Sequence, residues 1–435
     1  MKLKIILPFT FFIIAFCSCK KHDQPAHVNK YSADVANSWM QMQIRLTRST
    51  TGYNSVVSDR SFAYAGITMY EALVPCSPGK KSLLPQIGGP AFATIKNADQ
   101  RYWPASVNAA MAMITKSFFE TTSPANMASI DSLENAFTTK FKTESDPSKI
   151  ENAVNFGHQV ATEIFNWSKT DGGHQAYKHL VDSTYTPPVG DGLWVPTFPA
   201  FGRPIFPHWG NNKSFIANIA TMALPEPPFA FDTMPHSPFY EMVNELYKIS
   251  LSLTHEDSVI AKFWGDQPGN FNVPAHATNI LLQLIVKNDL SLTDAAAAYA
   301  LQGIAMNDAA ITVFKAKYKY NLLRPITFIR NIMKHPNWKT VIPTPPHPEY
   351  TAAHAVISAA SATVLEKIFG THYSFTDHTY DASYGARSFS SFEEYAKEAC
   401  RSRILAGIHY TPSIAIGLIQ GKLVGTKVNQ LRLNN

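Results

Sequence analysis

The chain has 435 residues, of which 45% are hydrophobic and 16% are charged. This length exceeds what one small core needs, and the composition has no low-complexity block, so the sequence predicts a large folded body rather than a disordered or fibrous protein. The formal net charge of +6 is spread along the chain instead of being gathered in runs, which excludes a nucleic-acid-binding footprint.

The N-terminus has the pattern of an export signal. A short basic region precedes an apolar stretch, residues 5–16, that is too short to span a bilayer comfortably. A small residue and Cys19 follow, which resembles a bacterial lipoprotein signal peptide (1–18) with Cys19 as the lipidated residue. An ordinary secretory signal is the alternative. We expect residues 19–31 to be a polar tether and the protein to be exported and lipid-anchored to a bacterial membrane, in the periplasm or at the cell surface.

The rest of the chain is punctuated as a series of helices. Apolar spacing, N-cap residues and closing Pro or Gly residues predict helices at 37–48, 58–74, 103–119, 124–141, 147–168, 238–252, 255–264, 275–288, 292–320, 352–369, 392–405 and 412–430. Strand-like alternation is rare. We therefore predict an all-α fold of two packed helical bundles, in which residues 32–435 form one domain with an N-terminal half (about 32–235) and a C-terminal half (about 236–435).

Residues 172–236 interrupt this helical pattern. They are rich in Pro, Gly and aromatic residues, and long irregular segments of this kind are usually functional lids or disordered. The density of Phe, Tyr and Trp between Tyr185 and Trp209 argues against disorder. We expect this segment to wrap over the helices and to pack there.

Some reactive residue types carry weak signals. A loop contains potential metal ligands, but it lacks a standard ligand spacing, so we expect solvated loop residues there. These residues are His372, Asp377, His378 and Asp381. Cys76 and Cys400 either form a disulfide or remain buried free thiols, and their positions in the sequence do not decide between the two.

Lys317 and Arg324 belong to a K-x6-R-P pattern. Seven residues on a helix make almost two turns, so we expect both cations on one side of a helix. Pro325 should disturb the backbone just after Arg324. Taken alone, the pair also fits two solvated surface cations.

His354 follows a proline-rich approach, residues 345–348. The prolines favour an extended backbone, and Thr351 is expected to cap the helix that follows. The backbone N–H groups of Ala352, Ala353 and His354 would then form an anion seat. A histidine in this first turn can exchange a proton with a bound ligand, although a structural histidine is the alternative.

Ser402-Arg403 precedes His409 in an S-R-x5-H pattern. Arg403 is expected in the last turns of one helix, which Gly407 ends. His409 lies just before the next helix, for which Thr411 is the expected cap. A neutral imidazole in this position can attack phosphorus or coordinate a metal-oxo centre.

In their order and spacing, these three stretches resemble the signature K-x6-R-P, P-S-G-H and S-R-x5-H-x3-D, which vanadium-dependent haloperoxidases share with type 2 phosphatidic acid phosphatases. The resemblance is widest to haloperoxidase-related bacterial proteins. It extends to the runs AYAGITMYEAL, YTPP-x4-LW-x-PT and DAAITVFKAKYKYNLLRPITFIR, and so over most of the mature chain. It implies the helical-bundle fold of that superfamily, with the catalytic residues in the C-terminal half.

The resemblance also implies a role for each matching residue. His409 would be the ligand to vanadium or the phosphohistidine nucleophile, and His354 would be the acid/base. Phe314 and His347 would line a halide pocket, and a histidine at position 347 resembles the bromide-oxidising pattern. The positions implied to bind the oxygens of vanadate or phosphate are Lys317, Arg324, Ala353 and Arg403.

Two signature positions differ in this chain. The family's P-S-G-H is Thr351-Ala352-Ala353-His354, and the lost serine hydroxyl weakens anion binding by roughly 1.5–3 kcal/mol, or about 10- to 100-fold. The final aspartate is replaced by Ser413, and losing an orienting carboxylate costs other enzymes up to about 10⁴-fold in rate. Another carboxylate from elsewhere in the chain would have to replace it.

Three functions are compatible with these residues. The leading one is a vanadate-dependent haloperoxidase-like enzyme that oxidises halide with peroxide. The second is a phosphomonoesterase that works through a phosphohistidine and needs no cofactor. The third is a catalytically impaired lipoprotein that binds an oxyanion, which Ala352 and Ser413 favour. In each case the expected partners are a small anion and, through a lipid anchor only, a membrane, and the sequence leaves the oligomeric state open.

Overall fold

The computed structural model describes residues 31–92, 95, 97–265 and 270–434. The predicted signal peptide, Cys19 and nearly all of the tether lie outside the described residues. The α-helices of the described chain are α1 (Asp34–Ser49), α2 (Ser55–Glu71), α3 (Leu84–Ile87), α4 (Trp103–Phe118), α5 (Pro124–Phe141), α6 (Pro147–Ser168), α7 (Ile219–Met222), α8 (Pro238–Ser250), α9 (His255–Phe263), α10 (Val273–Lys287), α11 (Leu292–Tyr320), α12 (Pro325–Asn331), α13 (Ala353–Phe369), α14 (Phe392–Leu405) and α15 (Thr411–Val428).

The all-α prediction is confirmed, and each predicted helix is found within three residues at either end. The sequence patterns missed the short helices α3, α7 and α12. They also missed a two-stranded antiparallel sheet, formed by β1 (Phe375–Asp377) and β2 (Arg387–Phe389). Short strands of this kind carry too few residues for alternation to be visible.

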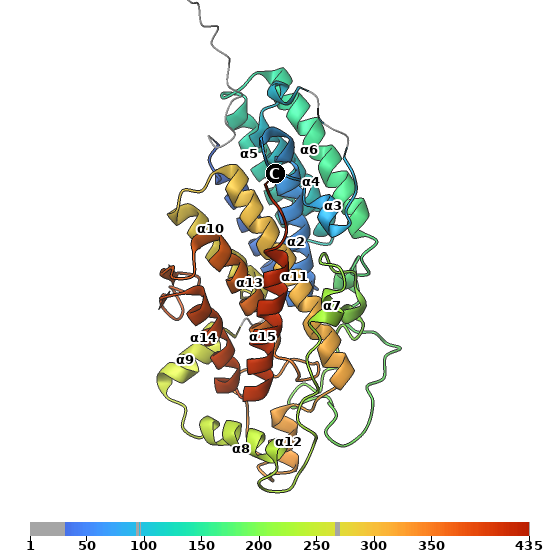
Figure 1. Cartoon of the computed structure of the whole chain (residues 1–435), viewed down its shortest axis with the longest axis vertical. Coiled ribbons are helices and arrows are strands. Elements are labelled where there is room, and N and C mark those ends of the chain that lie inside the picture. Colours follow the sequence, from blue (N-terminus) through green and yellow to red (C-terminus); the bar gives the residue numbers. More distant parts are fainter. Residues whose placement is uncertain (1–30, 93–94, 96, 266–269, 435) are drawn as a thin grey trace, which may run out of the picture.

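Helix α11 is the central element of the molecule. Figure 1 shows α5 and α6 at one end of the elongated fold and α8 and α12 at the other, with α11 running between them. Every residue of α2 beyond its first is buried, and α2 crosses α11 at two glycines. A Cβ on Gly66 would lie 2.6 Å from the carbonyl oxygen of Tyr299, and one on Gly303 would lie 2.8 Å from Cα of Ala63. Glycine therefore allows these two backbones to touch.

Helices α13 and α15 pack side by side and run in the same direction. Gly417 approaches Ala352 and Ala355 at the start of α13, whereas Gly425 approaches Ala360 and Thr363 further along it. Both helices therefore begin at the same end of the pair. The residues just before each helix, and the exposed N–H groups of each first turn, are brought to the same region.

The irregular segment packs as expected over the C-terminal end of α11. The backbone N–H of Trp194 donates to Asn321, and that of Ile205 donates to Pro346. Trp194 and Trp209 are buried. The prediction that this segment wraps over the helices is confirmed.

Two remaining sequence questions concern thiols and membranes. Cys76 and Cys400 are both buried and free, so they do not pair. Within the described residues, none of the helices combines the length and apolarity that crossing a membrane requires.

Candidate oxyanion site

The site lies where the C-terminal end of α11 meets the starts of α13 and α15. Lys317 is in the last turn of α11, which ends at Asn321 in a left-handed conformation (φ 46°, ψ 38°). Arg324 lies outside α11 and is the N-cap of α12, with Pro325 at its first position. The prediction that one helix face carries both cations is therefore wrong. They come together because the chain turns at Asn321 and α12 starts at the proline.

Lys317 and Arg324 are completely buried. Lys317 Nζ donates to the carbonyl oxygens of Pro348 (2.9 Å) and Glu349 (2.8 Å). Burial, and then the charge of Arg324, hold the pKa of Lys317 well below its ordinary value. Burial lowers the pKa of Arg324 to about 10, partly offset by Glu349. The interpretation of this pair as solvated surface cations is excluded.

Arg324 connects the proline-rich segment 345–348 to His409. Its Nε donates to the carbonyl oxygen of His347 (2.9 Å), and Nη2 lies 3.0 Å from His347 Nδ1. Its Nη1 donates to the carbonyl oxygen of Ile408 (2.8 Å) and lies 3.2 Å from His409 Nε2. One guanidinium therefore holds both histidines in place.

His409 faces a carboxylate that the sequence did not single out. Its Nδ1 lies 2.8 Å from Oε1 of Glu349, and the same oxygen accepts the backbone N–H of Tyr410 at 3.0 Å. Both side chains are almost completely buried. Since Nδ1–H donates to Glu349, Nε2 carries the lone pair. Burial and the neighbouring cations Arg324 and Lys317 hold the pKa of His409 well below its ordinary value, so the ring is neutral.

Glu349 thus lies where a carboxylate can orient the His409 ring. Burial raises its pKa to about 7, against the opposing effects of Lys317 and Arg324. Ser413, at the family's aspartate position, is buried near this carboxyl and lowers its pKa, but neither Ser413 Oγ nor Glu349 Oε2 makes a hydrogen bond of normal length. One signal for Glu349 was present in the sequence, because it is the only acidic residue between Asp308 and Glu366.

The second histidine of the signature pairs with the last arginine. His354 is at the second position of α13 and is partly buried. Arg403 Nη1 lies 3.1 Å from His354 Nε2 and 3.5 Å from Nδ1. The same Nε2 lies 3.1 Å from the carbonyl oxygen of Trp264. The charge of Arg403 lowers the pKa of His409, so the His354–Arg403 pair lies close enough to His409 to affect it electrostatically.

The start of α13 differs from the prediction. Ala352 is the N-cap, without a side-chain hydrogen bond, and the helix begins at Ala353. Thr351 does not cap it: Thr351 lies one residue before the N-cap, and its hydroxyl donates to Gln420 on α15 at 2.6 Å. Thr411 is likewise the first residue of α15 rather than its cap, which is Tyr410. The N-cap residue Ala352 therefore gives the first turn of α13 no side-chain cap.

Phe314 and His347, the two residues of the predicted halide pocket, are adjacent. Their ring centroids are 5.4 Å apart, and both side chains are buried. Burial, followed by the charges of Lys317 and Arg324, holds the pKa of His347 well below its ordinary value. Position 347 therefore presents a neutral imidazole.

The loop with potential metal ligands does not form a metal site. The described residues contain no group of three or more His, Cys, Asp or Glu side chains arranged around a cation. His378 and Asp381 form an exposed pair. Asp377 is completely buried, so the expectation of a solvated residue is wrong at that position.

These side chains together fit an oxyanion. Lys317 and Arg324 are two buried cations that share one carboxylate, Glu349, whose own charge is weakened by its raised pKa. Helix N-termini at α13 and α15 add positive potential. A tetrahedral anion would balance this excess of positive charge and find the lone pair of His409 Nε2 beside it.

The comparisons with known proteins point in the same direction. A family model described as the VCPO second helical-bundle domain matches residues 297–434, which contain Lys317, Arg324, His354, Arg403 and His409. No curated protein matches the sequence.

Similar solved structures cover nearly the whole chain. A bacterial vanadium-dependent iodoperoxidase is 28% identical, with a TM-score of 0.83 over 95% of this chain and 99% of that one. The holo form of a bacterial vanadium-dependent chloroperoxidase is 15% identical, with a TM-score of 0.68 over 88% and 93% of the two chains. Its apo form is 13% identical, with a TM-score of 0.68 over 87% and 93%. The two chloroperoxidase structures share the fold.

Proposed function

We propose that this chain is a vanadate-dependent enzyme that oxidises halide with peroxide, because residues 297–434 match the VCPO second helical-bundle domain and the whole fold is similar to a bacterial vanadium-dependent iodoperoxidase. The observation that carries this proposal is the buried bond between His409 Nδ1 and Glu349 beside the cations Lys317 and Arg324. It places the lone pair of His409 on Nε2, 3.2 Å from Arg324 Nη1, in a cationic environment that suits a ligand to an oxyanion.

The residues that would hold vanadate are the buried cations and the first turn of α13. Vanadate, when bound, supplies the centre at which peroxide is activated toward halide. Lys317, Arg324 and Arg403 would balance the charge of its oxygens, and the N–H of Ala353 would donate to them. Because Lys317 also donates to two backbone carbonyls, it holds the Glu349 segment in place at the same time.

The two histidines have different tasks in this proposal. His409 keeps its proton on Nδ1, where Glu349 accepts it, and this fixes the ring orientation and raises its basicity. His354 is partly buried and sits at a helix start, so it can reach solvent and exchange protons with a bound ligand. The buried, neutral His409 is unsuited to that second task.

We propose iodide as the halide and bromide as a weaker substrate. The bacterial iodoperoxidase matches 95% of this chain, which supports iodide as the substrate. The neutral imidazole of His347 beside Phe314 offers a hydrogen-bond donor and an aromatic face to a large, weakly hydrated anion.

The test is halide oxidation by vanadate-loaded protein with peroxide and iodide, bromide or chloride. We expect turnover that falls at least about 100-fold in His409→Ala, because the ligand is removed. A matched control is His208→Ala, which removes an exposed histidine outside the site. Equal rates in the wild type and His409→Ala would overturn the proposal.

Two further measurements separate the alternatives. Hydrolysis of an aryl phosphate that depends on His409 would identify a phosphomonoesterase instead. Binding of vanadate by calorimetry, without halide oxidation or phosphate hydrolysis, would identify an impaired oxyanion-binding protein.

We also propose that Cys19 is lipidated and anchors the protein to a membrane. The apolar stretch followed by a small residue and Cys19 supports this. Cys19→Ala should move the protein from the membrane fraction to the soluble fraction, and an unchanged distribution would contradict the anchor.

A further inference from the structure

The short hairpin of β1 and β2 places two opposite charges next to each other. Asp377 on β1 is paired directly with Arg387 on β2, so both side chains leave the same face of the hairpin. In a protein built almost entirely from helices, this hairpin holds two side chains at a fixed separation. Each of them binds a partner on a different helix.

Asp377 binds His276, which lies on α10. The His276 Nε2 is 2.8 Å from Asp377 Oδ2, and both side chains are almost completely buried. The other oxygen of Asp377 accepts the backbone N–H of Thr379 (2.9 Å) and the amide of Gln283 (3.3 Å). His276 is therefore fixed in orientation by a carboxylate that is itself held on both oxygens.

Arg387 binds Glu398, which lies on α14. Its Nε lies 2.6 Å from Oε1 of Glu398 and its Nη2 lies 2.7 Å from Oε2. This two-pronged geometry orients the carboxylate as well as neutralising it. A second carboxylate, Glu256 on α9, lies 2.9 Å from Arg387 Nη1.

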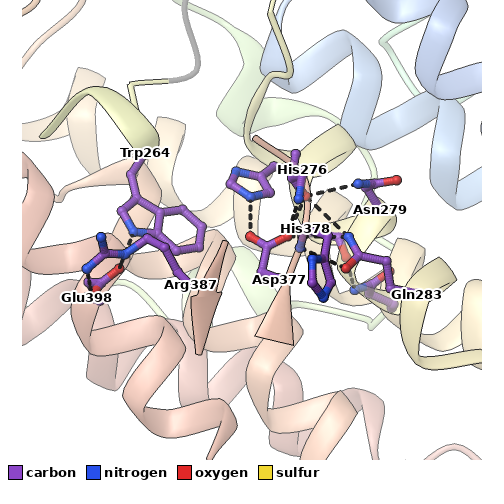
Figure 2. Close-up of polar contacts among 11 residues, drawn as sticks. Trp264, His276, Asn279, Gln283, Asp377, His378, Arg387 and Glu398 are labelled. Carbon is purple, nitrogen blue, oxygen red and sulfur yellow. Dashed lines mark hydrogen bonds and ion pairs between the residues drawn. The ribbon is translucent and has the colours of Figure 1, made fainter. Parts of the chain in front are cut away.

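Both of these partners hold Trp264. The indole stacks on the His276 ring at 4.6 Å with a 19° interplanar angle, and its Nε1 donates to Glu398 Oε1 at 3.0 Å. Figure 2 shows Glu398 and Arg387 at one edge of the indole, and His276 with Asp377 on its other side. We call these five residues the Trp264 clamp.

The clamp ends at the candidate site. Trp264 caps the C-terminus of α9, and its carbonyl oxygen lies 3.1 Å from His354 Nε2. A carbonyl can only accept, so this contact requires a proton on Nε2. With the proton on Nε2, Nδ1 is the ring nitrogen that can accept from Arg403, whose Nη1 lies 3.5 Å from Nδ1 and 3.1 Å from Nε2.

We propose that the Trp264 clamp is a positioning device for His354, holding a carbonyl oxygen that selects the Nε2–H form of its ring. The clamp residues are positioning residues that act on His354 through Trp264. The importance of this for catalysis rests on the proposed function, in which His354 exchanges protons with the bound ligand.

The experiment compares three variants of α14. Glu398→Ala removes the acceptor of the indole N–H, whereas Glu398→Gln keeps an acceptor and removes the charge. Glu393→Ala is the matched control, because it removes an acidic residue from the same helix whose ion pairs, within the described part of the chain, are with Lys397 and Lys422. Circular dichroism checks that each variant is folded.

The direct readout is the tautomer of His354, from the ¹⁵N shifts of histidine-labelled protein assigned with His354→Gln. We expect the Nε2–H form in the wild type, Glu398→Gln and Glu393→Ala, and a mixture of both forms in Glu398→Ala. A pure Nε2–H form in folded Glu398→Ala would overturn the proposal. So would a wild type in the Nδ1–H form.

Kinetics provide the second readout. In Glu398→Ala we expect kcat for halide oxidation to fall about 10-fold, while the vanadate dissociation constant changes less than twofold, because a proton-exchanging group is misplaced and the anion seat is intact. An equal loss in Glu393→Ala would show a general structural effect and would contradict positioning. The tautomer readout needs no turnover, so it tests the clamp even if the proposed function fails.

Discussion

His409 and Glu349 are separated by 60 residues in the chain, yet Nδ1 of one lies 2.8 Å from Oε1 of the other in a buried environment. This carboxylate takes the place expected for an aspartate four residues after His409, where the chain has Ser413. The site therefore has an orienting carboxylate although the signature position lacks one. The departure at Ser413 does not by itself indicate an inactive protein.

Replacing Glu349 should lower the affinity for vanadate, because Glu349 orients the proposed ligand His409. In Glu349→Gln the side-chain oxygen still accepts the Nδ1–H, but the negative charge is lost, so we expect vanadate affinity to fall about 10- to 100-fold. Calorimetric titration with vanadate measures this. Ser413→Ala is the control, because its hydroxyl makes no hydrogen bond of normal length, and an equal loss in that variant would contradict the assignment.

Restoring the family's aspartate should be harmful. Ser413 is buried near Glu349, so Ser413→Asp would place two carboxyl groups in one buried region. We expect a lower melting temperature and weaker vanadate binding, since one carboxyl must stay protonated. The double variant Glu349→Gln/Ser413→Asp should recover part of both losses. A more stable or more active single variant would show that the two positions do not compete.

Restoring the serine should be beneficial. Ala352 caps α13 in an extended conformation (φ −70°, ψ 116°) and makes no side-chain hydrogen bond. In Ala352→Ser, a hydroxyl could bond either to a first-turn N–H or to the bound anion. We expect about 1 kcal/mol of added stability without ligand, and vanadate affinity that rises about 10-fold. Thermal melts with and without vanadate measure both quantities, and a destabilised variant with unchanged affinity would indicate crowding.

Glu71 should make stability depend on pH. Burial raises its pKa from 4.5 to about 7, and its Oε1 accepts the backbone N–H of Leu83 at 2.8 Å. Between these two pH values the folded protein holds the proton and the unfolded chain releases it. The contribution is therefore fully present below about pH 4.5 and is lost as pH rises through 7, by up to about 3 kcal/mol.

The measurement is denaturant unfolding of the wild type and Glu71→Gln from pH 4.5 to 8. Glutamine does not titrate and retains an oxygen acceptor for Leu83 N–H. The stability of the wild type relative to the variant should fall as pH rises. If the difference in unfolding free energy between the wild type and Glu71→Gln stays constant over this range, the pKa of Glu71 is not raised.

The local patterns of the sequence were sufficient for the helices, because caps and apolar spacing act within a few residues. Ser123, Ser237 and Thr254 cap the helices that they precede, each by accepting a backbone N–H. Thr351 is not the cap of α13, because the helix starts one residue later, with Ala352 as N-cap, and the Thr351 hydroxyl bonds to Gln420 on α15. The strands that pair Asp377 with Arg387 were missed because three residues each are too few to show an alternating pattern.

The sequence by itself determined the helical fold, the inventory of cations and histidines, and the resemblance to vanadium haloperoxidases, because each of these is expressed in residue type and short spacing. Only the tertiary structure decided how the site is supported. Glu349 reaches His409, and Trp264 reaches His354, through contacts between segments far apart in the chain. Such contacts depend on how α9, α13 and α15 pack, and that packing is the sum of many buried contacts that no local pattern records.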